Sequence, residues 1–250
     1  MTINFTHIFQ DSWNFLRNRP QAVIFLLALQ IVDELLVSFM DAFLGGNATQ
    51  LVLTPMPLQS AEASQNIALF LLAKQLIDLL IAGWSLMLIA FISQQTTNPY
   101  IQGLTRTIQR FLGIFALNII VVLPLVFSLL QALPALRQQA EPSLFTLFLF
   151  IIGIVLYIRL NLTPLHYLAS NDNIRQTIKT IWQAGTGRVS LLFVYSLLAY
   201  LVVPLINSKL STIADGGVFD ILGFLISISL NVFIYVFTYR FYTLFMQKAR

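Results

Sequence analysis

Five charged residues stand within stretches of the chain that are otherwise apolar. They are Asp33, Glu34, Asp41, Lys74 and Asp78. A charged side chain at the centre of a bilayer costs about 2.5–3.5 kcal/mol on insertion scales, so such residues usually face protein or water. Asp41 falls near the end of its apolar stretch, where water can solvate it. The other four residues form the candidate intramembrane polar cluster.

Three interpretations of this cluster remain open from the sequence. In the first, the charges form a structural ion-pair cluster that holds the first two spans together, in which Lys74 can pair with the acids of the neighbouring span or with Asp78 one helical turn away. In the second, the four residues line a polar cavity that handles protons or a small solute. In the third, the first span ends near Val32 and leaves Asp33 and Glu34 at the surface.

Motifs for catalysis are absent from the sequence. The chain has no cysteine, and its two histidines, His7 and His166, are far apart. It contains no paired-histidine or cysteine ligand set, no nucleophile elbow, no Walker loop and no dinucleotide-binding glycine motif. We therefore expect a protein without enzymatic activity, cofactor or metal ion.

The composition places the charged cluster in a membrane protein. Apolar residues make up 58% of the 250 residues and charged residues only 10%, whereas a soluble domain carries about 25% charged residues. Six segments reach the roughly 20 apolar residues that a membrane-spanning helix needs. We predict an all-α fold, a single domain over residues 1–250, with six transmembrane helices at 21–44, 67–94, 111–133, 144–167, 190–206 and 218–245. The proline-containing stretch at 45–65 is predicted to be an irregular connector rather than a binding loop.

The positive charges predict one orientation. With a cytoplasmic N-terminus, the inner side carries Arg17, Arg19, Arg106, Arg110, Arg159, Arg175, Lys179, Arg188, Arg240, Lys248 and Arg250. The outer side carries only Arg137 and Lys209. This bias predicts a multi-pass protein of a cytoplasmic membrane with both termini in the cytoplasm. Because the basic residues flank apolar spans instead of forming one polar face, we expect no nucleic-acid partner despite the net charge of +4.

Three short segments on the predicted cytoplasmic side have helical amphipathic spacing. Their apolar residues are Phe5, Phe9, Trp13 and Leu16; then Ile101, Leu104, Ile108 and Phe111; then Ile174, Ile178, Ile181 and Trp182. Such segments favour helices in the lipid headgroup layer. The segments also predict three repeated units, at approximately 1–94, 95–168 and 169–250. The candidate contacts with membrane phospholipids are Trp13, Arg17, Arg19, Arg106, Arg110, Arg159, Trp182, Arg188 and Arg240.

Four short motifs carry a resemblance to a known family. They are INF at 3–5, DSWNFLRN at 11–18, IKTIWQ at 178–183 and IYVFTYRFY at 234–242. With these motifs the chain resembles the YciC-like family of uncharacterised bacterial inner-membrane proteins over essentially its whole length. The resemblance implies a multispan protein of the bacterial inner membrane with no established reaction, and it supplies no catalytic residues.

Two functional hypotheses follow. The first is a non-enzymatic role in envelope organisation or lipid homeostasis, exerted through the three amphipathic segments. The alternative is a transporter or channel for a small solute that uses the polar cluster between the first two spans. Protein partners are not identified by the sequence, and a homo-oligomer is compatible with it.

Overall fold

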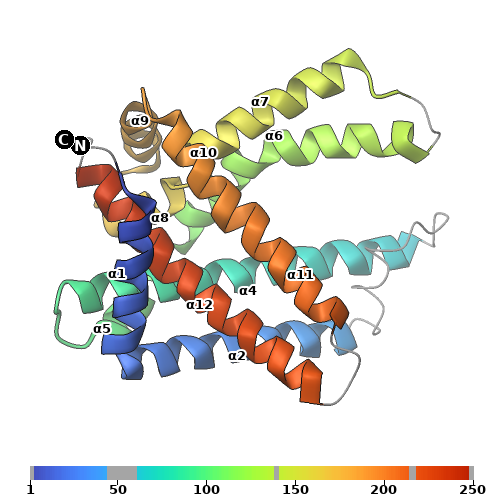
Figure 1. The fold of residues 1–250 in the computed structure, drawn as a ribbon. Helices are drawn as coiled ribbons and strands as arrows, with labels where there is room; N and C mark the ends of the chain where they lie inside the picture. The colour runs from blue at the N-terminus through green and yellow to red at the C-terminus, as the bar shows by residue number, and fades with distance from the viewer. Residues whose placement is uncertain (1–2, 44–60, 138–140, 214–217, 248–250) are drawn as a thin grey trace.

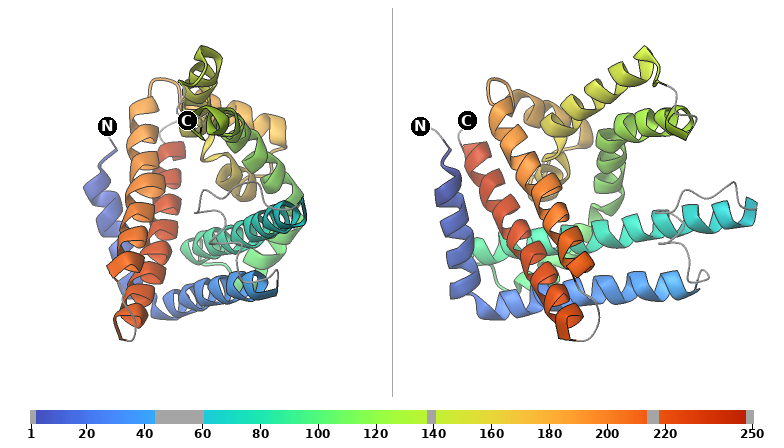
Figure 2. Two further views of the ribbon diagram at one scale, coloured as in Figure 1. Left: turned by 90° about the vertical axis from the view of Figure 1, so that its right-hand side faces the viewer. Right: turned by 45° about the vertical axis from the view of Figure 1, so that its right-hand side comes forward.

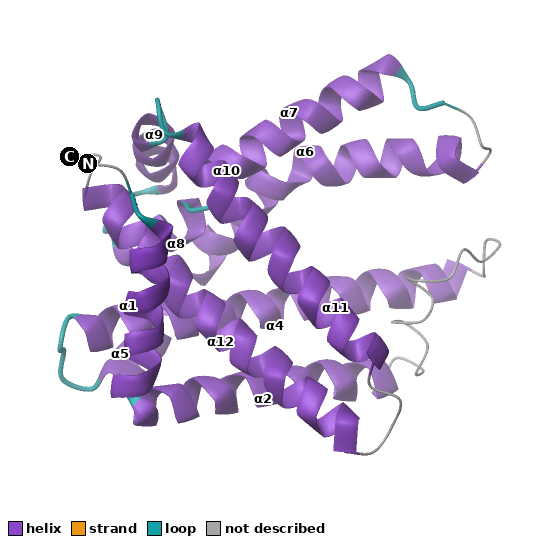
Figure 3. Cartoon of the chain, in the orientation of Figure 1, coloured by secondary structure: helices purple, strands orange, loops and turns teal. Residues whose placement is uncertain are grey.

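The described part of the chain is helical throughout. The computed structural model describes residues 3–43, 61–137, 141–213 and 218–247, and within these ranges it contains no strand (Figure 3). The predicted connector at 45–65 lies outside the described residues as far as residue 60, and helix begins at Ala61. The predicted all-α fold is confirmed.

Six helical spans are long and apolar enough to cross a membrane, as predicted. In chain order they are α2 (Pro20–Phe43), α4 (Ala61–Ser93), α6 (Phe111–Arg137), α7 with α8 (Leu144–Leu160 and Thr163–Ala169), α10 with η1 and α11 (Val189–Leu197, Leu198–Val202 and Val203–Ile213), and α12 (Val218–Gln247). Because α2 continues as far as Phe43, the interpretation in which the first span ends near Val32 is wrong.

A short helix occupies each of the three segments with amphipathic spacing. These helices are α1 (Phe5–Asn18), α5 (Pro99–Gln109) and α9 (Ile174–Ala184), and all three lie at the end of the molecule that carries both termini (Figure 1). Helix α9 begins with a capping box, in which the Asn173 side chain and the Gln176 side chain satisfy each other's backbone N–H groups. Asn98 precedes α5 with a φ of 60°, and Pro99 then supplies the fixed φ that suits a first helical residue.

The fourth and fifth spans are irregular, and a proline accounts for each irregularity. Pro164 has no N–H to offer the carbonyl of Leu160, so α7 stops there, and the Thr163 hydroxyl donates to that carbonyl at 2.6 Å. In the fifth span Pro204 likewise cannot bond to the Tyr200 carbonyl. The preceding turn, η1, widens to π geometry, and the Val203 N–H donates to the carbonyl of Leu198.

The densely packed interior occupies the half of the molecule nearer the termini. The buried residues of α2 all fall between Ala22 and Gln30, and those of α12 begin at Ile228. Beyond these points the hairpin of α2 and α4 and the hairpin of α6 and α7 diverge, as the views in Figure 1 and Figure 2 agree. Large side chains there, such as Phe39 and Phe219, are exposed, as expected of surfaces that face lipid.

Candidate functional site

A polar cavity lies where the packed half of the molecule meets the diverging half. This cavity, the central chamber, has a volume of about 450 Å³ and is lined by residues of all six spans. Its polar lining consists of Gln30, Asp33, Glu34, Lys74, Gln75, Asp78, Asn118, Tyr157, Asn161, Tyr195, Tyr200, Asn231, Tyr235 and Thr238. A volume of about 300–1,000 Å³ is typical of a site for a small molecule.

All four residues of the predicted polar cluster line the central chamber. Lys74 Nζ donates to both carboxylate oxygens of Asp78, at 2.9 and 3.1 Å, so the ion pair lies within α4. No ion pair joins Lys74 to Asp33 or Glu34 among the described residues, although Asp33 interacts electrostatically with the other three charged residues. The side chains of Lys74 and Asp78 are 42% and 37% exposed. The pair therefore lines an accessible cavity and does not form a dry contact between two helices.

Tyrosine and amide side chains form the remainder of the polar lining. Tyr157 of α7 and Tyr195 of α10 both pack edge-on against Tyr200 of η1, with ring centroids 5.3 and 6.1 Å apart. The Tyr195 hydroxyl donates to Thr238 Oγ1 at 3.1 Å, which ties this wall to α12. Asn161 donates to Ser196 Oγ at 2.6 Å, while its own Oδ1 atom is buried without a hydrogen-bond partner among the described residues.

Both irregular spans place their irregular residues at the chamber. Asn161 and Leu162, which separate α7 from α8, line it, and so do Ala199 and Tyr200 of the π turn. Helix breaks and π turns expose backbone polar groups, which a membrane protein tolerates only where they face protein or a polar cavity. Such interruptions are common at the binding sites of transporters and other functional sites.

The chamber is closed toward the end of the molecule that carries the termini. One and two turns beyond Thr238, the side chains of Phe241 and Phe245 are fully buried, and Ile114 and Leu117 of α6 are equally inaccessible. A group of hydrogen bonds follows, which we call the clasp: His166 bonds to Tyr242 through Nδ1 at 2.8 Å and to Asp172 through Nε2 at 3.1 Å. Access in this conformation is therefore from the diverging half.

Arg106 and Arg110, two of the candidate lipid contacts, complete the clasp. Arg106 donates to the carbonyls of Leu168 and Ser170, at 3.1 and 2.5 Å. Arg110 donates to the carbonyls of Tyr167 and Asp172, and its guanidinium lies 4.4 Å from the centre of the Tyr167 ring. Burial, and then the charge of Arg110, lowers the pKa of Arg106 from its ordinary value. Both arginines thus bind the carbonyl-rich end of α8.

The other candidate lipid contacts lie around the same end of the molecule. The Arg159 guanidinium lies 3.9 Å from the centre of the Trp182 ring, and Arg240 lies 5.7 Å from that of Phe15. Arg188 donates to the Phe245 carbonyl at 3.5 Å.

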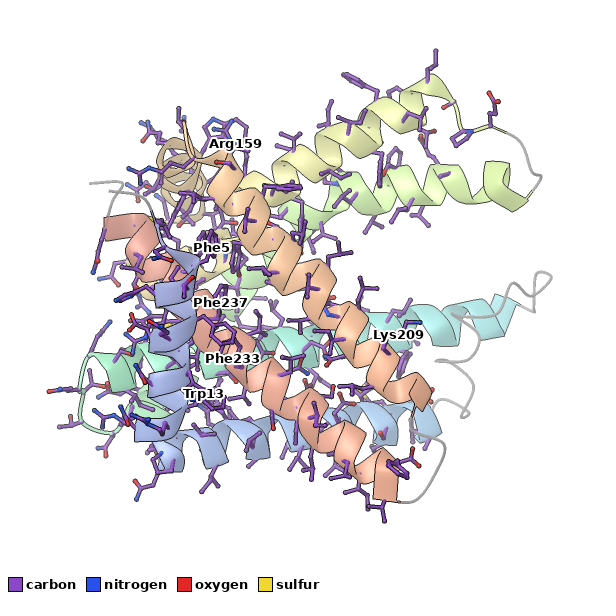
Figure 4. All side chains as sticks on the ribbon, in the orientation of Figure 1. Phe5, Trp13, Arg159, Lys209, Phe233 and Phe237 are labelled. Atoms are coloured by element: carbon purple, nitrogen blue, oxygen red, sulfur yellow. The ribbon has the colours of Figure 1, made fainter. Side chains whose placement is uncertain are left out.

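Trp13 and Arg17 line a groove of about 320 Å³ formed by α1, α2 and α12. Arg19 lines a separate hollow beside Tyr100. Figure 4 shows Trp13 on α1 and Arg159 near the opposite corner of this end.

Ten polar lining residues were not identified from the sequence. They are Gln30, Gln75, Asn118, Tyr157, Asn161, Tyr195, Tyr200, Asn231, Tyr235 and Thr238. A signal for part of this set was present, because Asn231, Tyr235 and Thr238 follow the spacing of one helix face, as do Gln30, Asp33 and Glu34. The residues of the fourth and fifth spans have no such signal, since the break and the π turn shift their register.

A comparison with curated proteins finds one full-length relative from Haemophilus influenzae. The two sequences are 33% identical over 250 residues, which cover 99% of this chain and 100% of the relative. The relative is described as an uncharacterized protein. No protein-family model matches the chain, and no solved structure matches it significantly.

Proposed function

The chain belongs to the family of the Haemophilus influenzae protein. We propose that it is an integral membrane protein that binds a small polar solute in the central chamber and passes this solute across the membrane. One observation carries this proposal: charged, amide and phenolic side chains from all six spans line one accessible cavity. A purely structural ion pair would need neither this volume nor the contributions of the other four spans.

The irregularity of the fourth and fifth spans favours a chamber that a solute passes through over a polar core that stays fixed. The chamber is accessible from one half, and its other side is sealed by buried aromatic residues and the clasp. Passage then requires the clasp to open while the diverging half closes, and the break at Asn161 and the π turn at η1 provide places for the spans to bend.

Cysteine labelling tests the proposal directly, because the chain contains no cysteine of its own. We expect Ala199→Cys and Asn118→Cys, both in the chamber, to react readily with N-ethylmaleimide, because a thiol must ionise in water to react. Leu201→Cys and Ile119→Cys are matched controls on the same helices. Their side chains are exposed on the outer surface, which we expect to face lipid and not water, so they should react at least about tenfold more slowly.

Movement of the solute has its own readout in the same variants. A membrane-impermeant maleimide, applied to either side of sealed vesicles, should reach the chamber positions from both sides. Chamber cysteines as slow as the controls would overturn the hydrated chamber. Labelling from one side alone would overturn passage across the membrane.

A second role at the membrane surface is supported by a separate observation. Helices α1, α5 and α9 leave large apolar side chains uncovered at the end with the termini, including Trp13, Ile101 and Ile108. We place these helices in the headgroup layer of a bacterial inner membrane with both termini in the cytoplasm, as the YciC-like resemblance and the distribution of basic residues imply. Envelope organisation or lipid homeostasis is the corresponding function.

A further inference from the structure

The net charge of the central chamber favours a cation. Its ionisable lining holds three carboxylates, from Asp33, Glu34 and Asp78, against the single ammonium of Lys74. Lys74 is engaged by Asp78 through two hydrogen bonds, and the described residues record no ion pair for Asp33 or Glu34. A cavity with this excess of negative charge repels anions and attracts cations, the more strongly because the low-dielectric helices around it focus the electric field of these charges.

The tyrosine wall favours an organic cation over a metal ion. Tyr157, Tyr195 and Tyr200 converge on the chamber from α7, α10 and η1, and the Tyr200 ring is inclined at 73° and 85° to the rings of Tyr157 and Tyr195. Aromatic faces attract ammonium groups, and quaternary ammonium compounds are recognised by cages of such rings. The three carboxylates do not converge as metal ligands: the described residues contain no group of three or more histidine or acidic side chains placed so that they could hold one metal ion.

A buried amide supplies an independent indication of a ligand. Gln30 lines the chamber and is 4% exposed; its Nε2 atom makes no hydrogen bond of normal geometry among the described residues, although its amide interacts with the Tyr235 hydroxyl, which also lines the chamber. A buried N–H donor left unpaired costs about 1–3 kcal/mol, so it is expected to meet an acceptor when the site is in use. The neighbouring acids are on the same helix face, one turn away.

We propose that the ligand of the central chamber is a small organic ammonium compound that also carries an oxygen acceptor. Its cationic group lies between the carboxylates of Asp33 and Glu34 and the ring of Tyr200, and its oxygen accepts from Gln30 Nε2. This inference rests on the proposed function, since it names the class of solute that the chamber holds.

Equilibrium binding of radiolabelled choline to the full-length protein in lipid nanodiscs tests the inference. Choline is the probe because it combines a quaternary ammonium with one hydroxyl oxygen. We expect saturable binding that tetramethylammonium displaces less well, because it lacks the oxygen, and that acetate and glycerol do not displace.

Matched variants assign the individual contacts. Tyr200→Leu and Asp33→Asn should each weaken choline binding by about tenfold, while Tyr200→Phe, which keeps the ring, should retain most of it. Gln30→Met should abolish the preference for choline over tetramethylammonium. Asp41→Asn, on the same span but outside the chamber, should bind as the parent does. Gel filtration of each variant checks that it is folded.

The outcomes separate this inference from the proposed function. If N-ethylmaleimide labels the chamber cysteines but choline fails to bind, or binds equally well to Tyr200→Leu and Asp33→Asn, the organic cation is wrong while a hydrated chamber stands. If the chamber cysteines resist labelling, the chamber itself is wrong and the cation is excluded with it.

Discussion

Lys74 does not make the ion pair between the first two spans that the nearby acidic residues Asp33 and Glu34 suggest. Its ion pair with Asp78 is local to α4 and partly exposed, whereas Asp33 and Glu34 face the same cavity without an ion pair among the described residues. An exposed pair of this kind contributes about 0–1 kcal/mol to stability. Lys74 therefore sets the charge of the chamber more than it holds the first two spans together.

The substitution Lys74→Met tests this role, because the direction in which it changes the affinity for choline differs between the two interpretations. We expect the folded yield to stay close to that of the parent and the affinity for choline to rise severalfold, because Asp78 loses its internal counter-ion. Equilibrium binding in nanodiscs and gel filtration measure the two quantities.

Lys179→Met is the control, since Lys179 lies on α9 outside the chamber. A collapse of folded yield in Lys74→Met alone would favour the structural ion pair. Weaker choline binding by a well-folded variant would contradict the cation-selective chamber.

Two elements with interrupted hydrogen bonding give the chamber its shape. The break between α7 and α8 directs Asn161 inward, and the π turn η1 directs Tyr200 toward Tyr157 and Tyr195. At each of them lies a proline, which cannot donate a backbone hydrogen bond. Pro124, in contrast, lies within an α6 that remains helical from Phe111 to Arg137, so a proline by itself does not make an irregular turn.

Restoring the missing backbone donor should disturb the site more than the fold. In Pro204→Ala the new N–H can bond to the Tyr200 carbonyl, which favours α over π geometry and turns Tyr200 relative to the chamber. We expect choline binding to weaken by about tenfold, the contribution of one cation–π contact, with no loss of thermal stability. Pro124→Ala serves as the comparison. If both variants bind choline with the same affinity, the π turn does not contribute to the binding site.

The whole molecule divides along its long direction into a packed half and a diverging half. The packed half holds the termini, the clasp and helices α1, α5 and α9. Aromatic residues join α1 to α12 there, where the ring centroids of Phe5 and Phe237 lie 6.5 Å apart (Figure 4). Uncovered apolar side chains at this end, with Trp13 59% exposed, suit contact with the headgroup layer.

Fluorescence quenching tests where this end of the molecule lies in the bilayer. In a variant that keeps only Trp13, with Trp84 and Trp182 replaced by phenylalanine, lipids brominated near the headgroup should quench the emission more than lipids brominated near the chain ends. The Trp84-only variant is the control, because its indole is partly buried and donates to the Tyr100 carbonyl at 3.0 Å. Equal and weak quenching of Trp13 at both depths would place α1 away from the membrane surface.

The six spans, the absence of enzyme motifs and the four intramembrane charges could all be read from the sequence, because apolar length and a misplaced charge are local properties. The repeat, the orientation of the termini and the contacts with lipid remain predictions. The choice between an ion pair across two helices and a polar chamber needed the tertiary structure. Lys74 has carboxylates within reach on both α2 and α4, and local spacing cannot decide between them.

Only the folded chain brings Tyr157, Tyr195, Tyr200 and Asn161 to the acids of the first two spans. These residues are more than a hundred positions from Asp33 in the sequence, and they reach the chamber through a helix break and a π turn that shift the regular helical register. A periodic pattern reports which residues share a face of one regular helix. It carries no information on which faces of six helices meet, because that is decided by side-chain packing between distant segments.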